Sequence, residues 1–274
     1  QVSIGYQRYN VFNYAGLNIA QEDQGKFNNL NIKLRLSRNN IDQPIYPRSG
    51  GEFTLIGQLT APLVSRLGIG VNGDELRLMD EVDQYKWIEY HKYKFHAGWY
   101  SKIVENLVLY SKVNFGLLAS YNKNIPISPF ERFYMGGSGL TGFNIDGREI
   151  IPLRGFTEAN SSNVVYKGEG INGGVGAIKY TMEMRYPISL EQQATIYALA
   201  FAEAGNTFSS LRQFDPFDVK RTAGMGIRLF LPMLGMLGFD YGFPFDAANR
   251  ILQPTFSSFP GQFTFTFGGN ISGW

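Results

Sequence analysis

Apolar and polar side chains alternate along most of the chain with a period of two residues. In LNIKLRLS, residues 30–37, every even-numbered position is apolar and every odd-numbered position is polar. The same alternation recurs in KYKFHAGW at 92–99, TMEMRY at 181–186 and LGFDYGFPF at 237–245. This period is that of a β-strand with one apolar and one polar face. It predicts about ten strands, starting near residues 2, 27, 51, 85, 107, 176, 194, 219, 236 and 262, and no convincing helical period is found.

Two all-β architectures accommodate strands of this kind. A soluble sandwich buries the apolar face and exposes the polar face to water. An outer-membrane barrel turns the apolar face to lipid and the polar face to a wet lumen. Here aromatic residues dominate the apolar face and gather at strand ends, while the polar face carries Gly, Thr and paired charges. These features favour an all-β fold, an antiparallel transmembrane β-barrel of the outer-membrane type.

The lengths of the connections orient the barrel. Long connections are expected near 16–25, 62–84, 122–174, 206–218 and 246–261, and tight ones near 103–106, 187–193 and 232–235. Outer-membrane barrels have short periplasmic turns and long outer loops. The alternation therefore places Trp274 on the periplasmic side and the connection 122–174 on the outer side. That connection carries no convincing secondary structure of its own, and structureless connections of such length are usually functional or disordered.

Composition narrows the function classes. The 25 Lys and Arg residues are scattered almost evenly among 23 Asp and Glu residues, which argues against nucleic acid as a partner. The absence of Cys excludes a disulfide framework and a thiolate metal site. The sequence contains no run of about 18 apolar residues, the length that would predict a transmembrane helix. The chain starts with neither Met nor a signal-peptide core, so we expect it to begin after processing or partway through a longer protein.

Catalytic chemistry has little support in the sequence. His91 and His96 are the only histidines, and they fall on opposite faces of one predicted strand, so they cannot share a metal ion. Nucleophile-elbow, phosphate-loop, zinc and calcium motifs are missing from the sequence. An outer-membrane hydrolase with Glu183 and Glu203 as acid and base would lack a nucleophile and a metal. We therefore expect no enzyme activity, no metal and no cofactor.

Two carboxylates lie within the predicted wall. Glu183 is on the polar face of its strand, whereas the pattern around Glu203, ALAFAEAG, does not say which face meets lipid. A charge facing lipid at mid-depth costs about 2 to 4 kcal/mol for a base and somewhat less for an acid, so we expect Glu203 to face the lumen. A lumenal carboxylate needs a cation, and an arginine fork satisfies it well. That cation is either an arginine of the long connection or a residue of a neighbouring strand, such as Arg185, Lys220 or Arg228.

The long connection carries a motif that resembles a known family. ERFYMGGSG at 131–139 precedes LRGF at 153–156, as a glycine pair precedes V-R-G-F in the sixth outer loop of BamA-type outer membrane protein assembly factors, of the bacterial surface antigen superfamily. The resemblance continues through TMEMRYP, FAEAG, DVKRTAGMGIRLF and LGFDYGFPF, and spans nearly the whole chain. It implies that the chain is the C-terminal portion of a barrel of about sixteen strands. In the family, about six earlier strands and periplasmic POTRA modules precede this portion.

The resemblance also implies a site. The loop 122–174 would fold back into the lumen, where Arg154 would pair with Glu183 and Glu203 while Phe201 and Phe156 pack alongside. The implied loop motif comprises Gly136, Gly137, Leu153, Arg154, Gly155 and Phe156. Leu153 stands where valine is usual and Glu203 where aspartate is common. Arg148, in the stretch between the glycine pair and the tetrapeptide, is a second candidate for the ion pair.

The function implied by the resemblance is that of the central insertase of the β-barrel assembly machinery in the bacterial outer membrane. In that family the first and last strands pair poorly, so a lateral seam opens and an edge strand templates an incoming strand by β-augmentation. The seam strand here would be 262–274, weakened by its glycines. Its implied residues are Phe263, Phe265, Phe267, Gly268, Gly269 and Trp274.

The implied partners are unfolded outer-membrane proteins, accessory envelope lipoproteins or surface proteins, and outer-membrane lipid. Asn270 and Ser272 replace apolar residues expected of an ideal barrel-assembly signal, which weakens any argument from the C-terminus alone. Two alternatives stay open: a protein-secreting transporter of the same superfamily, and a passive outer-membrane porin with an open lumen.

Overall fold

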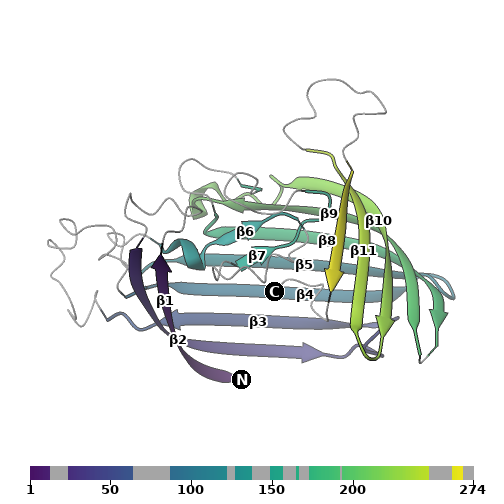
Figure 1. Ribbon diagram of the computed structural model, residues 1–274, viewed down its shortest axis with the longest axis horizontal. Helices are drawn as coiled ribbons and strands as arrows, with labels where there is room; N and C mark the ends of the chain where they lie inside the picture. Colours follow the sequence, from purple (N-terminus) through teal and green to yellow (C-terminus); the bar gives the residue numbers. More distant parts are fainter. Residues whose placement is uncertain are drawn as a thin grey trace.

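In the described residues the fold is one curved antiparallel sheet of ten strands with a separate pair of short strands, which confirms the all-β prediction (Figure 1). The computed structural model describes residues 1–12, 24–63, 87–121, 127–137, 149–156, 165–166, 173–191, 193–246 and 261–267. In sheet order the strands are β1 (Val2–Phe12), β2 (Gln24–Asn39), β3 (Gly50–Thr60), β4 (His91–Lys102), β5 (Val108–Ala119), β8 (Gly176–Leu190), β9 (Thr195–Phe208), β10 (Lys220–Leu231), β11 (Gly235–Pro244) and β12 (Gln262–Phe267).

The strand starts follow the predicted ones closely, with one exception. β4 begins at His91 rather than near residue 85. The preceding residues pair with β2 instead of β5: Trp87 forms an isolated bridge with Asn28, and the amide of Ile88 donates to the Asn28 carbonyl at 2.9 Å. Alternation alone does not distinguish this short excursion from the strand that follows it.

The two faces of the sheet are inverted relative to a soluble protein. Along β8, Met182, Met184 and Tyr186 are exposed, whereas Lys179 and Glu183 on the opposite face are buried. β1, β2, β10 and β12 likewise present exposed apolar side chains outward. Buried charges paired with one another and exposed large apolar residues suit lipid outside and a polar lumen inside. The membrane barrel, rather than the soluble sandwich, is the architecture that this arrangement supports.

In its described residues, the long connection between β5 and β8 contains three short elements, so the expectation that it has no secondary structure is wrong. They are the 3-10 helix η2 (Pro129–Glu131) and two strands, β6 (Phe133–Met135) and β7 (Glu149–Ile151), which pair in parallel. Strands of three residues are too short to show a period in the sequence. Figure 1 shows β6 and β7 inside the curve of the sheet, on its lumenal side.

The connections alternate in length as the pattern predicted. The turns 103–107, 191–194 and 232–234 are short, while the strands are joined at their other ends by longer segments such as 209–219. The connection 40–49 folds inward: the buried Tyr46 donates its hydroxyl hydrogen bond to the Arg185 carbonyl at 3.0 Å and packs on Tyr197. This connection therefore lies against the lumenal face at the short-turn end.

The sheet is open within the described part of the chain. β1 and β12 stand at its two edges, and each pairs there with a single neighbour, β2 and β11. Among the described residues, no helix is long and apolar enough to cross a membrane.

Candidate functional site

The glycine pair and the tetrapeptide of the long connection lie side by side. The amide of Gly136 donates to the Ile151 carbonyl and the amide of Leu153 donates to the Gly137 carbonyl, both at 3.0 Å. The parallel pairing of β6 and β7 ends at Met135 and Ile151, and Gly137 and Leu153 then form an isolated antiparallel bridge. The connection thereby presents Arg154, the next residue, to the lumenal face of the sheet.

Arg154 is buried, and its guanidinium contacts carboxylates from three strands. Its Nη2 lies 2.7 Å from Glu183 Oε1 on β8 and 2.8 Å from Glu203 Oε1 on β9. Its Nη1 lies 3.5 Å from Asp240 Oδ1 on β11. The backbone amide of Arg154 also donates to Glu203 Oε2 at 3.0 Å, and the guanidinium stacks on the Phe201 ring at 3.8 Å. One side chain thus joins three strands of the wall.

Each of these carboxylates has a further cation from the wall. Glu183 is paired with Arg185 and Glu203 with Lys179, and Asp240 accepts two hydrogen bonds at 2.8 Å from the Arg228 guanidinium. Of the strand cations that the sequence suggested as alternative partners, Arg185 and Arg228 lie in this network, together with Arg154. Lys220 forms no ion pair within the described residues. The loop arginine and the strand cations therefore act together rather than as alternatives.

Sequence reasoning missed Asp240. The alternation in LGFDYGFPF placed it on the polar face of its strand, between Gly238 and Gly242. This position could have identified Asp240 as a third lumenal acid, two strands beyond Glu203. The family resemblance, however, implied only Glu183 and Glu203 as partners of Arg154. In the network, burial disfavours the charged form of Arg154, and the carboxylates, Glu203 first, outweigh this effect and hold the pKa of Arg154 above its ordinary value.

Gly155 follows the arginine where the loop touches β11. Its φ is +85°, in the left-handed region. A Cβ at this position would lie 2.5 Å from Thr222 Oγ1 and 3.0 Å from the carbonyl carbon of Gly242. Only a glycine allows the tetrapeptide to approach β10 and β11 this closely. Phe156, which the family resemblance placed beside Arg154, is partly buried and packs against the apolar cluster described next.

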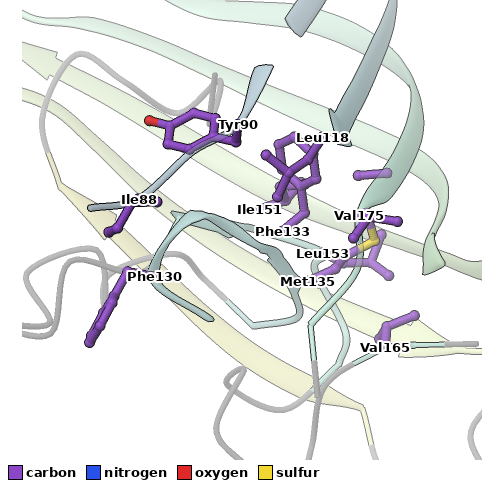
Figure 2. Packing of buried hydrophobic residues seen from close by; sticks show 11 residues of the cluster. Ile88, Tyr90, Leu118, Phe130, Phe133, Met135, Ile151, Leu153, Val165 and Val175 are labelled. Carbon is purple, nitrogen blue, oxygen red and sulfur yellow. The ribbon is translucent and has the colours of Figure 1, made fainter. Parts of the chain in front are cut away.

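An apolar cluster holds the loop against the wall (Figure 2). The loop contributes Phe130, Phe133, Met135, Ile151, Leu153 and Val165, and the wall side contributes Ile88, Tyr90, Leu118, Val175 and Ala177. Burying one such large side chain contributes about 1.5 to 3 kcal/mol, whereas a buried ion pair is close to neutral against an apolar replacement. The cluster therefore supplies most of the attraction, and the ion pairs fix where the loop sits.

A second group of charges joins the loop to β2 and β4, on the same lumenal face but nearer the β1 edge of the sheet. The sequence did not predict this group. Glu149 of β7 lies 2.7 Å from Lys92 Nζ and 2.6 Å from Lys94 Nζ, both on β4. Glu131 of η2 accepts a hydrogen bond from Asn29 Nδ2 on β2 at 2.8 Å, and its carbonyl accepts one from Lys92 at 2.7 Å. Both lysines had been placed on the polar face, but nothing in the sequence named their partners.

A cavity of about 580 Å³ adjoins Arg154 in the lumen. Its lining includes the carboxylates of the network, the inward-folded connection 40–49 and Lys112 of β5. His96 faces the lumen and contacts Asn114 and Glu52, while His91 contacts Tyr93 and Tyr121. In the described residues no group of His, Asp or Glu side chains is arranged to hold a metal ion.

The sequence profile of the Omp85 superfamily domain matches residues 1–271, almost the entire chain. The chain belongs to the Omp85 superfamily. An Omp85 barrel with this fold implies an outer-membrane location.

A similar solved structure supports the fold of this Omp85 chain. It is the crystal structure of BamA from Haemophilus ducreyi lacking POTRA domains 1-3, with a TM-score of 0.58 and 16% identity. The match covers 89% of this chain and 42% of the BamA chain, so the Omp85 chain spans less than half of that protein's length. At this identity the likeness concerns the fold, and it confirms the predicted resemblance to the C-terminal part of a BamA-type barrel.

Several residues named from the sequence lie outside the described part of this Omp85 chain. They are Arg148, the second candidate for the ion pair, and Gly268, Gly269, Asn270, Ser272 and Trp274, which follow β12 in the sequence. Phe263, Phe265 and Phe267 of β12 are described, and all three side chains are on the outward face.

Proposed function

We propose that this Omp85 chain folds and inserts outer-membrane proteins in the bacterial outer membrane, with its last strand forming one side of a lateral seam. The observation that carries the proposal is that, in the described part of the chain, the contacts between the tetrapeptide and the wall extend to β11 but not to β12. Arg154 contacts β8, β9 and β11, and Gly155 lies against the backbone of β11. Within the described residues, no hydrogen bond or ion pair joins the tetrapeptide 153–156 to β12. A wall braced up to its penultimate strand leaves the last strand free to move.

The place of β12 in the sheet fits this role. Among the described residues it pairs with β11 along Gln262–Phe267, and no strand lies on its other side. An edge strand presents unpaired backbone amides and carbonyls, which can template another strand. This edge position supports a seam strand that exchanges its partner more readily than the strands behind it.

The proposal extends to the partners and to the whole protein. The substrates are unfolded outer-membrane proteins, and accessory envelope lipoproteins or surface proteins and outer-membrane lipid complete the assembly complex. POTRA modules elsewhere in the protein would deliver the substrate, as the POTRA domains named for the similar BamA structure suggest. In this proposal the protein templates the strands of its substrate and lets them enter the membrane. The proposal therefore assigns no catalytic residue, metal or cofactor.

A secreting transporter of the same superfamily and a passive porin are the alternatives. Both need a path through the lumen. The loop is held there by the apolar cluster and by ion pairs at both ends, so a path would require these contacts to break. This supports insertion through the wall over passage along the axis.

Cross-linking tests the proposal with the complete protein in liposomes. A Thr266→Cys variant places a thiol on β12, and the substrate carries a thiol in its C-terminal strand. The matched control is Thr54→Cys on β3, which is paired on both sides. We expect disulfide formation with the substrate at position 266 and not at 54, together with faster substrate folding than in protein-free liposomes. Equal cross-linking at both positions, or no acceleration of folding, would refute the proposal.

A further inference from the structure

The second group of charges stands at one end of a short chain segment whose other end is Arg154. Glu149 is held by Lys92 and Lys94 on β4, and five residues later Arg154 is held by carboxylates on β8 and β9. The two ends of this segment thus meet different regions of the same sheet, with β5 between them.

The length of the segment matches the distance it has to cover. From β4 to β9 the sheet has three interstrand spacings, about 14 Å. The register places Glu203 level with Gly98 of β4, four residues from Lys94, which adds about 13 Å along the strands. The distance between Lys94 and Glu203 across the sheet is therefore about 19 Å. Five extended residues cover about 17 Å, and the charged side chains at the two ends of the segment span the difference.

The segment between the two ends is itself fixed. Ile151 and Leu153 are fully buried in the apolar cluster, and Lys179 on β8 donates a hydrogen bond to the Pro152 carbonyl. A segment of this length, extended and anchored at both ends, has little slack. Glu149 and Arg154 are therefore the two ends of one extended segment that is held along its length.

We propose that Lys92, Lys94 and Glu149 are positioning residues that make the segment 149–154 a strut across the lumenal face, and that this strut sets the place of Arg154. The ammonium groups of β4 hold one end, and the carboxylates of β8 and β9 hold the other. Strands β4 to β9 are thereby kept at a constant spacing while the strands beyond them carry the seam.

Hydrogen exchange on the complete protein in detergent tests the strut. The amide of Arg154 donates to Glu203, so its exchange reports directly on the far end. In Glu149→Gln, loss of the charge pair is expected to speed exchange in the peptide 150–156 by about ten- to a hundredfold, while β8 and β9 keep their protection. Glu105→Gln, at an exposed position in the β4–β5 turn, is the matched control and should leave exchange unchanged.

A charge exchange separates positioning from general stability. Glu149→Lys should release the far end, and adding Lys94→Glu should restore part of the protection of the Arg154 amide, because one of the two pairs is re-formed with opposite polarity while Lys92 still faces the new cation. Lys94→Gln, which leaves the Lys92 pair, should give an intermediate effect. Wild-type exchange in Glu149→Gln, uniform deprotection of β8 and β9, or failure of the charge exchange to restore protection would each overturn the proposal.

Insertion activity of the same variants gives a separate result that rests on the proposed function. If exchange rises as expected and insertion is unchanged, the strut stands and the link to the seam fails. If exchange is unchanged, the strut fails whatever the activity.

Discussion

Replacing Arg154 by alanine removes the side chain that joins three strands of the wall. The variant keeps the backbone amide that donates to Glu203, so the path of the loop is preserved and only the guanidinium is lost. The substitution therefore isolates the contribution of the buried cation from that of the loop as a whole.

The structure sets the size of the effect. Breaking a buried ion pair by removing one partner costs about 3 to 5 kcal/mol, because a buried charge is left uncompensated. Here each of the three carboxylates keeps another cation, so the lower end, about 3 kcal/mol, applies. The stacking of the guanidinium on Phe201 at 3.8 Å adds up to about 2 kcal/mol when such a contact is shielded from water.

Urea unfolding of the complete protein in detergent, followed by the gel mobility difference between folded and unfolded barrel, measures this loss. The control is Arg221→Ala, whose guanidinium pairs with Asp246 at 3.0 Å while its side chain is 65% exposed. Exposed ion pairs contribute little, so we expect this control to remain close to the wild type. If Arg154→Ala is as stable as Arg221→Ala, the reasoning from buried charge compensation is wrong.

Three further substitutions probe the loop and the inward-folded connection. Gly155→Ala should cost at least about 1 to 2 kcal/mol, because an L-residue is strained at φ +85° and its Cβ would meet Thr222; urea unfolding measures it. Burial raises the pKa of Glu149, but two lysines outweigh this effect and lower it from 4.5 to about 2, so its ion pairs stabilise the fold fully above about pH 4.5 and are lost as the pH falls toward 2. The stability difference between wild type and Glu149→Gln should therefore be constant near neutral pH and shrink below pH 4.5; a difference that grows on acidification contradicts this assignment. Tyr46→Phe removes the hydroxyl bonded to the Arg185 carbonyl and should cost about 1 kcal/mol in the same unfolding assay, and no change would mean that water replaces this bond.

The strands were predictable from the sequence because lipid and lumen impose opposite demands on alternate residues. The pattern at 181–186 places Glu183 inward and Met182 outward, as in the structure. The exception at residues 87–88 arose because these residues pair with β2, which is not a neighbour of β4 in the sheet. β6 and β7 were not predicted for a different reason, because a strand of three residues is too short to show a period of two.

The site was predictable only where a motif named its members. Arg154, Glu183 and Glu203 were named together, and the structure places them within hydrogen-bonding distance. The partnership of Glu149 with Lys92 was not accessible, because a loop residue without periodicity has no assigned face and its place depends on the packing of the whole loop. Charges on strands can be assigned to a face, whereas contacts between a strand and a loop depend on tertiary packing.

Two positions of the wall near the seam carry no side chain of their own. A Cβ at Gly224 of β10 would lie 2.6 Å from the Phe201 ring, and one at Gly242 of β11 would lie 2.7 Å from the amide nitrogen of Gly155. Bare backbone on these strands is covered by a neighbouring ring and by the loop. The final packing of β10 and β11 therefore includes the loop, which forms the inner surface of the wall at these positions.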